Sequence, residues 1–199
     1  LGVSQPSTVI AHLGKFKALR HLALWESPVT KAAMKKICAL PALDSLHLVY
    51  ADLDVAALRL VSQCRRLQFL VLDHAVAEEG IRGLVLPRQL KWLSLQNIDW
   101  SEKASFAFLD ALRDLEKLNL SNTEVSASKY LPHVLKLRSL QSLSLAENYD
   151  VHDASLDRLA SLKNLIYLDV TNCDVSCEGI SRMKKRRPEL TITHGVDCK

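Results

Sequence analysis

Leucines recur along this chain in a fixed pattern, L-x-x-L-x-L or L-x-x-L-x-V, with polar residues at many of the intervening positions. Seven copies are present: LRHLAL (19–24), LDSLHL (43–48), LQFLVL (67–72), LKWLSL (90–95), LEKLNL (115–120), LQSLSL (140–145) and LIYLDV (165–170). Their first leucines are 24, 24, 23, 25, 25 and 25 residues apart, and a degenerate copy begins at Leu190. Such even spacing indicates a repeat architecture.

Each unit combines two hydrophobic periods. The L-x-L alternation predicts a short strand with one buried face. A turn follows, and then apolar residues recur at helical spacing, as at Leu58, Val61 and Cys64. Between them lies a residue suited to cap a helix N-terminus. These predicted caps are Thr30, Asp54, Ser101, Ser126 and Ser176.

A strand, a turn and a helix within about 25 residues satisfy the crossover that parallel strands require. No single unit can bury its own apolar face, so the units must stack. We therefore expect an α/β solenoid with parallel strands on the concave face and helices outside. We expect one domain over residues 1–199: a partial N-terminal repeat (1–18), seven repeats (19–189), and a closing strand and tail (190–199). Pro87 should make the helix of the 67–89 repeat the shortest.

The repeats resemble those of leucine-rich repeat proteins. The helix entries VTKAAM, VAEEGI, VHDASL and VSCEGI are similar to the ribonuclease-inhibitor-like and cysteine-containing subtypes, and to repeats of F-box substrate receptors. The resemblance implies the horseshoe fold and a recognition role. Because this scaffold serves many unrelated tasks, it does not imply one particular activity.

Five cysteines are thinly spread: Cys38, Cys64, Cys173, Cys177 and Cys198. An odd, sparse set is not typical of a disulfide-stapled secreted domain, and the N-terminal residues do not resemble a signal peptide. We therefore expect reduced thiols in an intracellular protein, cytoplasmic or nuclear. Cys64 occupies a core position, and Cys173 and Cys177 fall in a repeat turn and at a helix start. A zinc site that also used His194 and Cys198 is an alternative, but we expect no metal and no Cys173–Cys177 disulfide.

No catalytic motif is present. The chain has no phosphate-binding glycine loop, no nucleophile elbow and no H-E-x-x-H. His21 and His47 fall on adjacent predicted strands, with His74 just beyond the third, and they could serve a metal or acid–base site. We expect them to be contact residues in a protein that is not an enzyme and needs no cofactor. No apolar run is long enough to span a bilayer.

The net charge of +4 comes mainly from one segment. The predicted last helix contains Arg182, Lys184, Lys185, Arg186 and Arg187. We expect a solvated helix face there, with a nuclear-localisation or anion-binding patch as the alternative. Because the remainder of the chain is close to neutral, nucleic-acid binding is not expected.

Alternation places the third, fifth and seventh residues of each motif on the concave face. Two tryptophans and other large side chains gather there in the first four repeats, whereas later repeats carry smaller polar residues. We expect a partner-binding surface formed by His21, Trp25, His47, Val49, Tyr50, Phe69, Val71 and Trp92. Aromatic residues dominate protein interfaces, so the sequence predicts a protein-interaction module that holds a protein partner on this face. The alternatives are a recognition arm of a larger protein, such as a ubiquitin-ligase receptor or immune sensor, and a metal-binding or enzymatic protein that uses the concave histidines.

Overall fold

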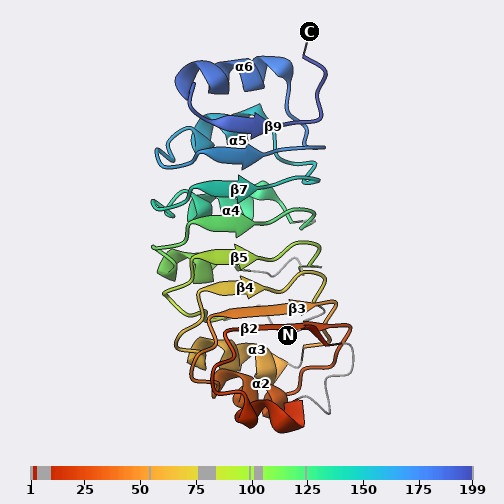
Figure 1. Ribbon diagram of the computed structural model, residues 1–199. Coiled ribbons are helices and arrows are strands. Elements are labelled where there is room, and N and C mark those ends of the chain that lie inside the picture. The colour runs from red at the N-terminus through yellow and green to blue at the C-terminus, as the bar shows by residue number, and fades with distance from the viewer. Residues whose placement is uncertain are drawn as a thin grey trace.

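A computed structural model describes residues 2–3, 10–53, 55–75, 84–98, 100, 105–123 and 125–198. Within these residues the strands form one nine-stranded parallel sheet whose spatial order is the chain order. The strands are β1 (Gly2–Val3), β2 (His21–Trp25), β3 (Ser45–Val49), β4 (Phe69–Val71), β5 (Trp92–Ser94), β6 (Lys117–Asn119), β7 (Ser142–Ser144), β8 (Tyr167–Asp169) and β9 (Thr191–Thr193). The two ends of the chain lie at opposite ends of the stack (Figure 1). The seven predicted strands and the closing strand are thus confirmed, and β1 adds a pairing in the segment assigned to a partial repeat.

The strand register keeps equivalent leucines in line. Leu22 pairs with Leu46, and the same row continues through Leu70, Leu93, Leu118, Leu143, Leu168 and Ile192. All of the leucines in this row are buried. Each repeat therefore adds apolar side chains to one continuous core.

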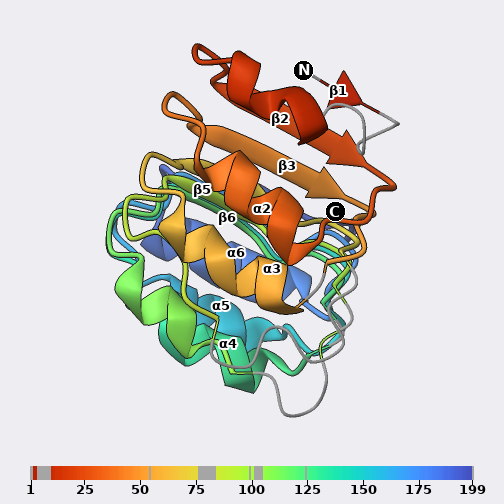
Figure 2. The ribbon, with the colours of Figure 1, turned by 90° about the horizontal axis from the view of Figure 1, so that it is seen from below.

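Helices cover only one face of the sheet (Figure 2). They are η1 (Leu13–Lys15), α2 (Lys31–Cys38), α3 (Val55–Leu60), η2 (Val61–Gln63), η3 (Ala107–Ala111), α4 (Ala127–Val134), α5 (Asp153–Leu159) and α6 (Cys177–Arg186). Three predicted caps are confirmed, because the hydroxyls of Thr30, Ser126 and Ser176 accept hydrogen bonds from N–H groups in the first turns of α2, α4 and α6. The predicted caps Asp54 and Ser101, and most of the helical segment before Pro87, lie outside the described residues.

The turns that leave the strands share a backbone conformation that we did not predict. One non-glycine residue per repeat has a positive φ: Glu26, Tyr50, His74, Asn97, Asn122, Glu147 and Asn172. Asn tolerates this left-handed region, but Tyr and Glu adopt it less readily. The strain is offset by pairing between repeats. For example, the N–H of Glu26 donates to the carbonyl of Val49, and the N–H of Asn122 donates to that of Ala146.

Two cysteine pairs are bonded, so the expectation of reduced thiols was wrong. Cys38, at the end of α2, forms a disulfide with Cys64, and Cys177, at the start of α6, forms one with Cys198 in the tail. Cys64 is 3% exposed, so its predicted core position is confirmed. Neither pair could be predicted from cysteine spacing, because the paired cysteines are 26 and 21 residues apart and become neighbours only when the repeats stack.

Cys173 remains a free thiol inside the turn after β8. Its Sγ donates to the carbonyl of Leu145, much as Asn148 Nδ2, one repeat earlier, donates to the carbonyl of Leu120. Burial is the main reason why the pKa of this thiol rises to about 11. Cys173 is therefore a structural residue of the repeat turn, and it is not bonded to Cys177.

Candidate functional site

The candidate site lies on the face of the sheet that the helices leave uncovered, which we call the open face. The first strands provide a cluster of rings there. The Trp92 ring meets the Phe69 ring edge-on, with centroids 6.4 Å apart, and meets the His47 ring in the same way at 6.0 Å. Strand pairing sets these contacts, since Phe69 and Trp92 are register partners on β4 and β5. All three side chains are half-buried.

Trp25 and Tyr50 project further into solvent. Trp25 ends β2 and is 46% exposed, and its register partner is Val49. Tyr50 is 54% exposed, and its ring stacks on that of His74 with centroids 4.1 Å apart. The left-handed turn conformation brings Tyr50 and His74 to the rim of the open face, where the His74 ring also bonds to Asn97. Large apolar surface left in water in this way is typical of interaction sites.

Val71 does not belong to the predicted surface. It is only 5% exposed, although its strand position is equivalent to that of His47. The register places it between His47 and Ser94, two residues along from Phe69 and Trp92, so larger side chains shield it. Position in the repeat predicted which way Val71 points, but not its exposure.

The three candidate histidines do not form one centre. His21 Nδ1 lies 3.6 Å from Asp44 Oδ1, His47 contacts Ser45 and Trp92, and His74 is held by Tyr50 and Asn97. Burial lowers the pKa of His47, and its charge attraction to Asp73 only partly offsets this. In the part of the chain that the structure describes, no three His, Cys, Asp or Glu side chains are grouped as a metal site.

A chain of polar groups runs from the end of β4 to β8, where Tyr167 is the large ring, 36% exposed. Asp73 accepts hydrogen bonds from the Ser94 hydroxyl and from the backbone N–H of Gln96. Asn119 donates to Gln96, Ser121 bonds to Ser144, and Asp169 accepts from Ser144 and Thr171. Because these groups already satisfy one another, this half of the open face has fewer free polar groups to offer a partner.

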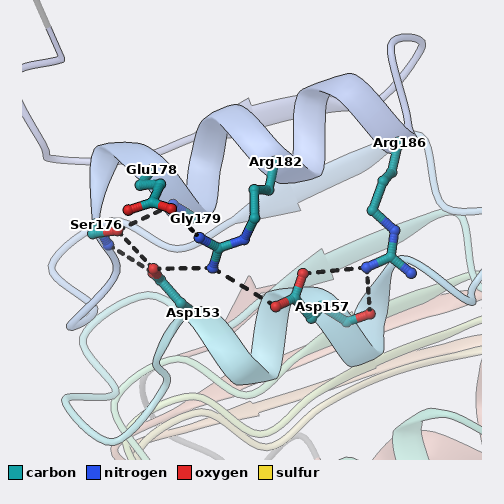
Figure 3. Close-up of polar contacts among 7 residues, drawn as sticks. All are labelled: Asp153, Asp157, Ser176, Glu178, Gly179, Arg182 and Arg186. Atoms are coloured by element: carbon teal, nitrogen blue, oxygen red, sulfur yellow. Dashed lines mark hydrogen bonds and ion pairs between the residues drawn. The ribbon is translucent and has the colours of Figure 1, made fainter.

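The predicted basic patch on α6 divides into three kinds of residue. Arg182 forms ion pairs with Asp153, Asp157 and Glu178, and Arg186 pairs with Asp157 (Figure 3). Lys184 and Lys185 are exposed. Arg182 and Arg186 thus remain partly exposed, but they are paired with acidic groups, mostly on α5.

Arg187 is a buried residue and is not part of a surface patch. It is 8% exposed, and its guanidinium donates to the carbonyls of Leu162, Lys163 and Leu165 and also binds Glu189. Those carbonyls belong to the turn that precedes β8. The side chain therefore joins the last helix to the repeat below it.

The stacked strand–turn–helix units define the chain as a leucine-rich-repeat type of α/β solenoid. No protein-family model matches the sequence. Among solved structures it is similar to an internalin (inlF) from Listeria monocytogenes, with a TM-score of 0.62, 16% identity, and coverage of 94% of this chain and 57% of that one. It is also similar to an internalin C2 (inlC2) from Listeria monocytogenes, with a TM-score of 0.53, 17% identity, and coverage of 92% and 83%. At these identities the likeness shows the fold alone.

The chain thus spans somewhat more than half of the first internalin and most of the second. Among the described residues, none of the helices has the length and hydropathy needed to cross a bilayer.

Proposed function

We propose that this chain is a non-enzymatic interaction module that holds a protein partner on the open face of its sheet. The observation that carries the proposal is the group of rings at one end of that face: Trp25 and Tyr50 are exposed, and the half-buried Phe69, Trp92 and His47 lie beside them. Tryptophan and tyrosine supply much of the binding energy at protein interfaces. His21 and Val49 border this group, whereas Val71 is excluded by its burial.

The same chain could be the recognition arm of a larger protein, since it matches 57% of the length of one internalin. The single-domain division and the ribonuclease-inhibitor-like subtype form part of the proposal. The α-helices of the covered face support that subtype. The rival metal-binding or enzymatic function has less support, because His21, His47 and His74 each have separate partners.

The state of the cysteines indicates the redox compartment in which the protein functions. The expectation of a cytoplasmic or nuclear protein depended on reduced thiols. Two disulfides, Cys38–Cys64 and Cys177–Cys198, instead favour an oxidising compartment, where such bonds persist. We therefore propose that the protein binds its partner in an oxidising compartment.

The test is substitution on the open face. Trp25→Ala should weaken partner binding by roughly thirtyfold, the effect of losing about 2 kcal/mol at a hot spot, with little change in melting temperature. Trp92→Ala should weaken binding as well but also cost some stability, because Trp92 packs against Phe69 and His47. Affinity capture and titration with the captured partner provide the measurement.

Ser142→Ala is the matched control on the same face, since Ser142 lies outside the hydrogen-bonded polar chain. Unchanged binding by both tryptophan variants would overturn the proposal. Equal losses in Ser142→Ala and Trp25→Ala would show that the interface is not confined to the rings.

A further inference from the structure

The turns at the two edges of the sheet carry exposed charged residues of mainly opposite sign. In most of the turns that enter the strands, the chain reverses through the same hydrogen bond: the N–H of the first motif leucine donates to the carbonyl three residues earlier, as at Leu19, Leu67, Leu90, Leu115, Leu140 and Leu165. The second residue of this turn is basic in most repeats. We call the resulting row the basic edge: Lys17, Arg65, Arg88, Arg113, Arg138 and Lys163.

Every side chain of the basic edge is exposed, and none forms an ion pair within the described residues. Other basic groups nearby are already neutralised. Lys91 pairs with Glu116, and Lys136 pairs with Asp110. The Asp110 carboxylate is therefore already paired. Burial acts to raise its pKa, but the hydrogen bonds from Lys136 and His133 outweigh burial and lower the pKa. Asp114, which follows Arg113 in the same turn, is an exposed acidic residue.

Direct contacts hold successive turns together. Gln89 Nε2 donates to the carbonyl of Arg65, 2.6 Å away, and Asn164 Nδ2 donates to the carbonyl of Arg138 at 2.7 Å. Neighbouring strands lie about 4.8 Å apart, so the five consecutive members from Arg65 to Lys163 form a row about 20 Å long. Pro41 occupies the equivalent position between Lys17 and Arg65 and interrupts the row.

The opposite edge, formed by the turns that leave the strands, has the reverse charge. Its described residues include Glu26, Asp52, Asp73, Glu147, Asp150 and Asp174. Within the described parts of 26–30, 50–53, 73–75, 96–98, 121–123, 146–152 and 171–176 there is no Lys or Arg. The two edges run along opposite sides of the stack (Figure 1). The chain, whose net charge is +4, therefore presents one basic and one acidic edge.

We propose that the basic edge binds a linear sulfated polysaccharide that runs along the solenoid axis. A single file of evenly spaced charges matches a single polyanionic strand, and most members are arginines, whose guanidinium groups bind sulfate through two hydrogen bonds. The five turns CRRL, PRQL, LRDL, LRSL and LKNL contain no aromatic residue on which bases could stack, which disfavours single-stranded nucleic acid. Apart from Arg66 beside Arg65, the row is one residue wide, so it also lacks the broad basic surface that a duplex requires. This proposal does not depend on the open-face function.

The experiment uses the full chain with its disulfides intact and a sulfated heparin octasaccharide, titrated over a series of NaCl concentrations. We expect salt-dependent binding. Arg113→Ser/Arg138→Ser should weaken it by roughly tenfold at low salt and reduce the slope of log K against log salt by about two. Lys31→Ser/Lys117→Ser removes the same charge from a helix start and from the open face, so it is the matched control and should bind like wild type.

Thermal unfolding of both double variants checks that the fold is retained, as expected for exposed, unpaired side chains. The absence of octasaccharide binding overturns the proposal, and so do equal losses in the two variants, which would indicate net charge alone. Tighter binding of an oligothymidylate of similar charge would reassign the edge to nucleic acid. Salt-sensitive self-association that Arg113→Ser/Arg138→Ser abolishes would reassign it to a second copy of this chain, docked through its acidic edge.

Discussion

Arg187 connects two repeats through its guanidinium group. The last carbonyls before β8 point toward the space under α6, and a buried carbonyl without a donor costs free energy. Arg187 supplies donors to Leu162, Lys163 and Leu165 at 2.6 to 3.0 Å. Its own charge is balanced by Glu189, whose pKa is lowered by the hydrogen bond from Arg187. A planar group with several donors suits this task better than lysine does.

Arg187→Met is expected to destabilise the protein by about 2 kcal/mol or more, because it leaves these carbonyls unpaired. Lys185→Met, which removes an exposed charge from the same helix, should change the free energy of unfolding by less than about 0.5 kcal/mol. Chemical denaturation of the two variants measures the difference. Similar unfolding free energies for both would show that Arg187 is dispensable.

For single residues, the sequence predicted which face of a strand a side chain points to better than it predicted how buried that side chain is. The leucine pattern placed Leu22, Leu46 and Leu70 in the core, because strand alternation is a local rule. Val71 and Arg187 were misassigned, because their burial depends on side chains in other repeats. A long arginine just after a helix is compatible with both solvent and a set of carbonyls. Whether the arginine lies in solvent or binds carbonyls depends on the turn one repeat away.

Helices α5 and α6 are joined at their N-terminal ends by one carboxylate. Asp153 accepts hydrogen bonds from the backbone N–H and the hydroxyl of Ser176, the residue that caps α6 (Figure 3). Gly179 lies against the same carboxylate, and a Cβ there would come within 2.2 Å of Asp153 Oδ1. A side chain at residue 179 would therefore displace the Asp153 carboxylate from its present position. The sequence predicted the Ser176 cap from local residue types, but the contribution of Asp153 comes from the preceding repeat.

The hydrogen bonds from Ser176, helped by Arg182, lower the pKa of Asp153. A folded-state pKa below the unfolded value of about 3.9 means that ionised Asp153 stabilises the fold above about pH 4, and that this is lost as the pH falls through the folded-state pKa. Asp153→Asn should therefore lower the melting temperature near pH 7 by a few degrees and have a smaller effect near pH 3. Circular dichroism at both pH values checks this, with the exposed Asp52→Asn as control. An equal shift at the two pH values would contradict it.

The whole molecule is a stack in which each unit contacts its neighbours. Repeat spacing alone predicted its parallel strands, because one turn and one crossover repeat along the chain. The two disulfides were not predicted, because pairing depends on which helix ends and tails become adjacent after stacking. The two charged edges were also not predicted. Their opposite charges largely cancel in the net charge, so the net charge does not reveal them.

Because each repeat contacts only its neighbours, the repeats at the two ends of the stack can unfold locally without the rest. At the C-terminal end, β9 pairs with only one strand, β8, and its outer residues Thr191 and Thr193 are exposed. The Cys177–Cys198 disulfide fixes the tail beyond β9 to the start of α6. In a repeat protein, loss of a terminal restraint should loosen the last unit and leave the distant units unchanged.

Cys198→Ser is therefore expected to accelerate amide hydrogen exchange in β9 and the tail by roughly tenfold or more, while exchange in β6 and β7 stays the same, because interior strands keep both neighbours. Cys173→Ser is the control. That thiol is free, and a serine hydroxyl can still donate to the carbonyl of Leu145. Exchange resolved by mass spectrometry along the chain makes the measurement. Acceleration spread evenly over all strands would instead mean that the stack unfolds as one cooperative unit, and that the disulfide stabilises the whole sheet by constraining the unfolded chain.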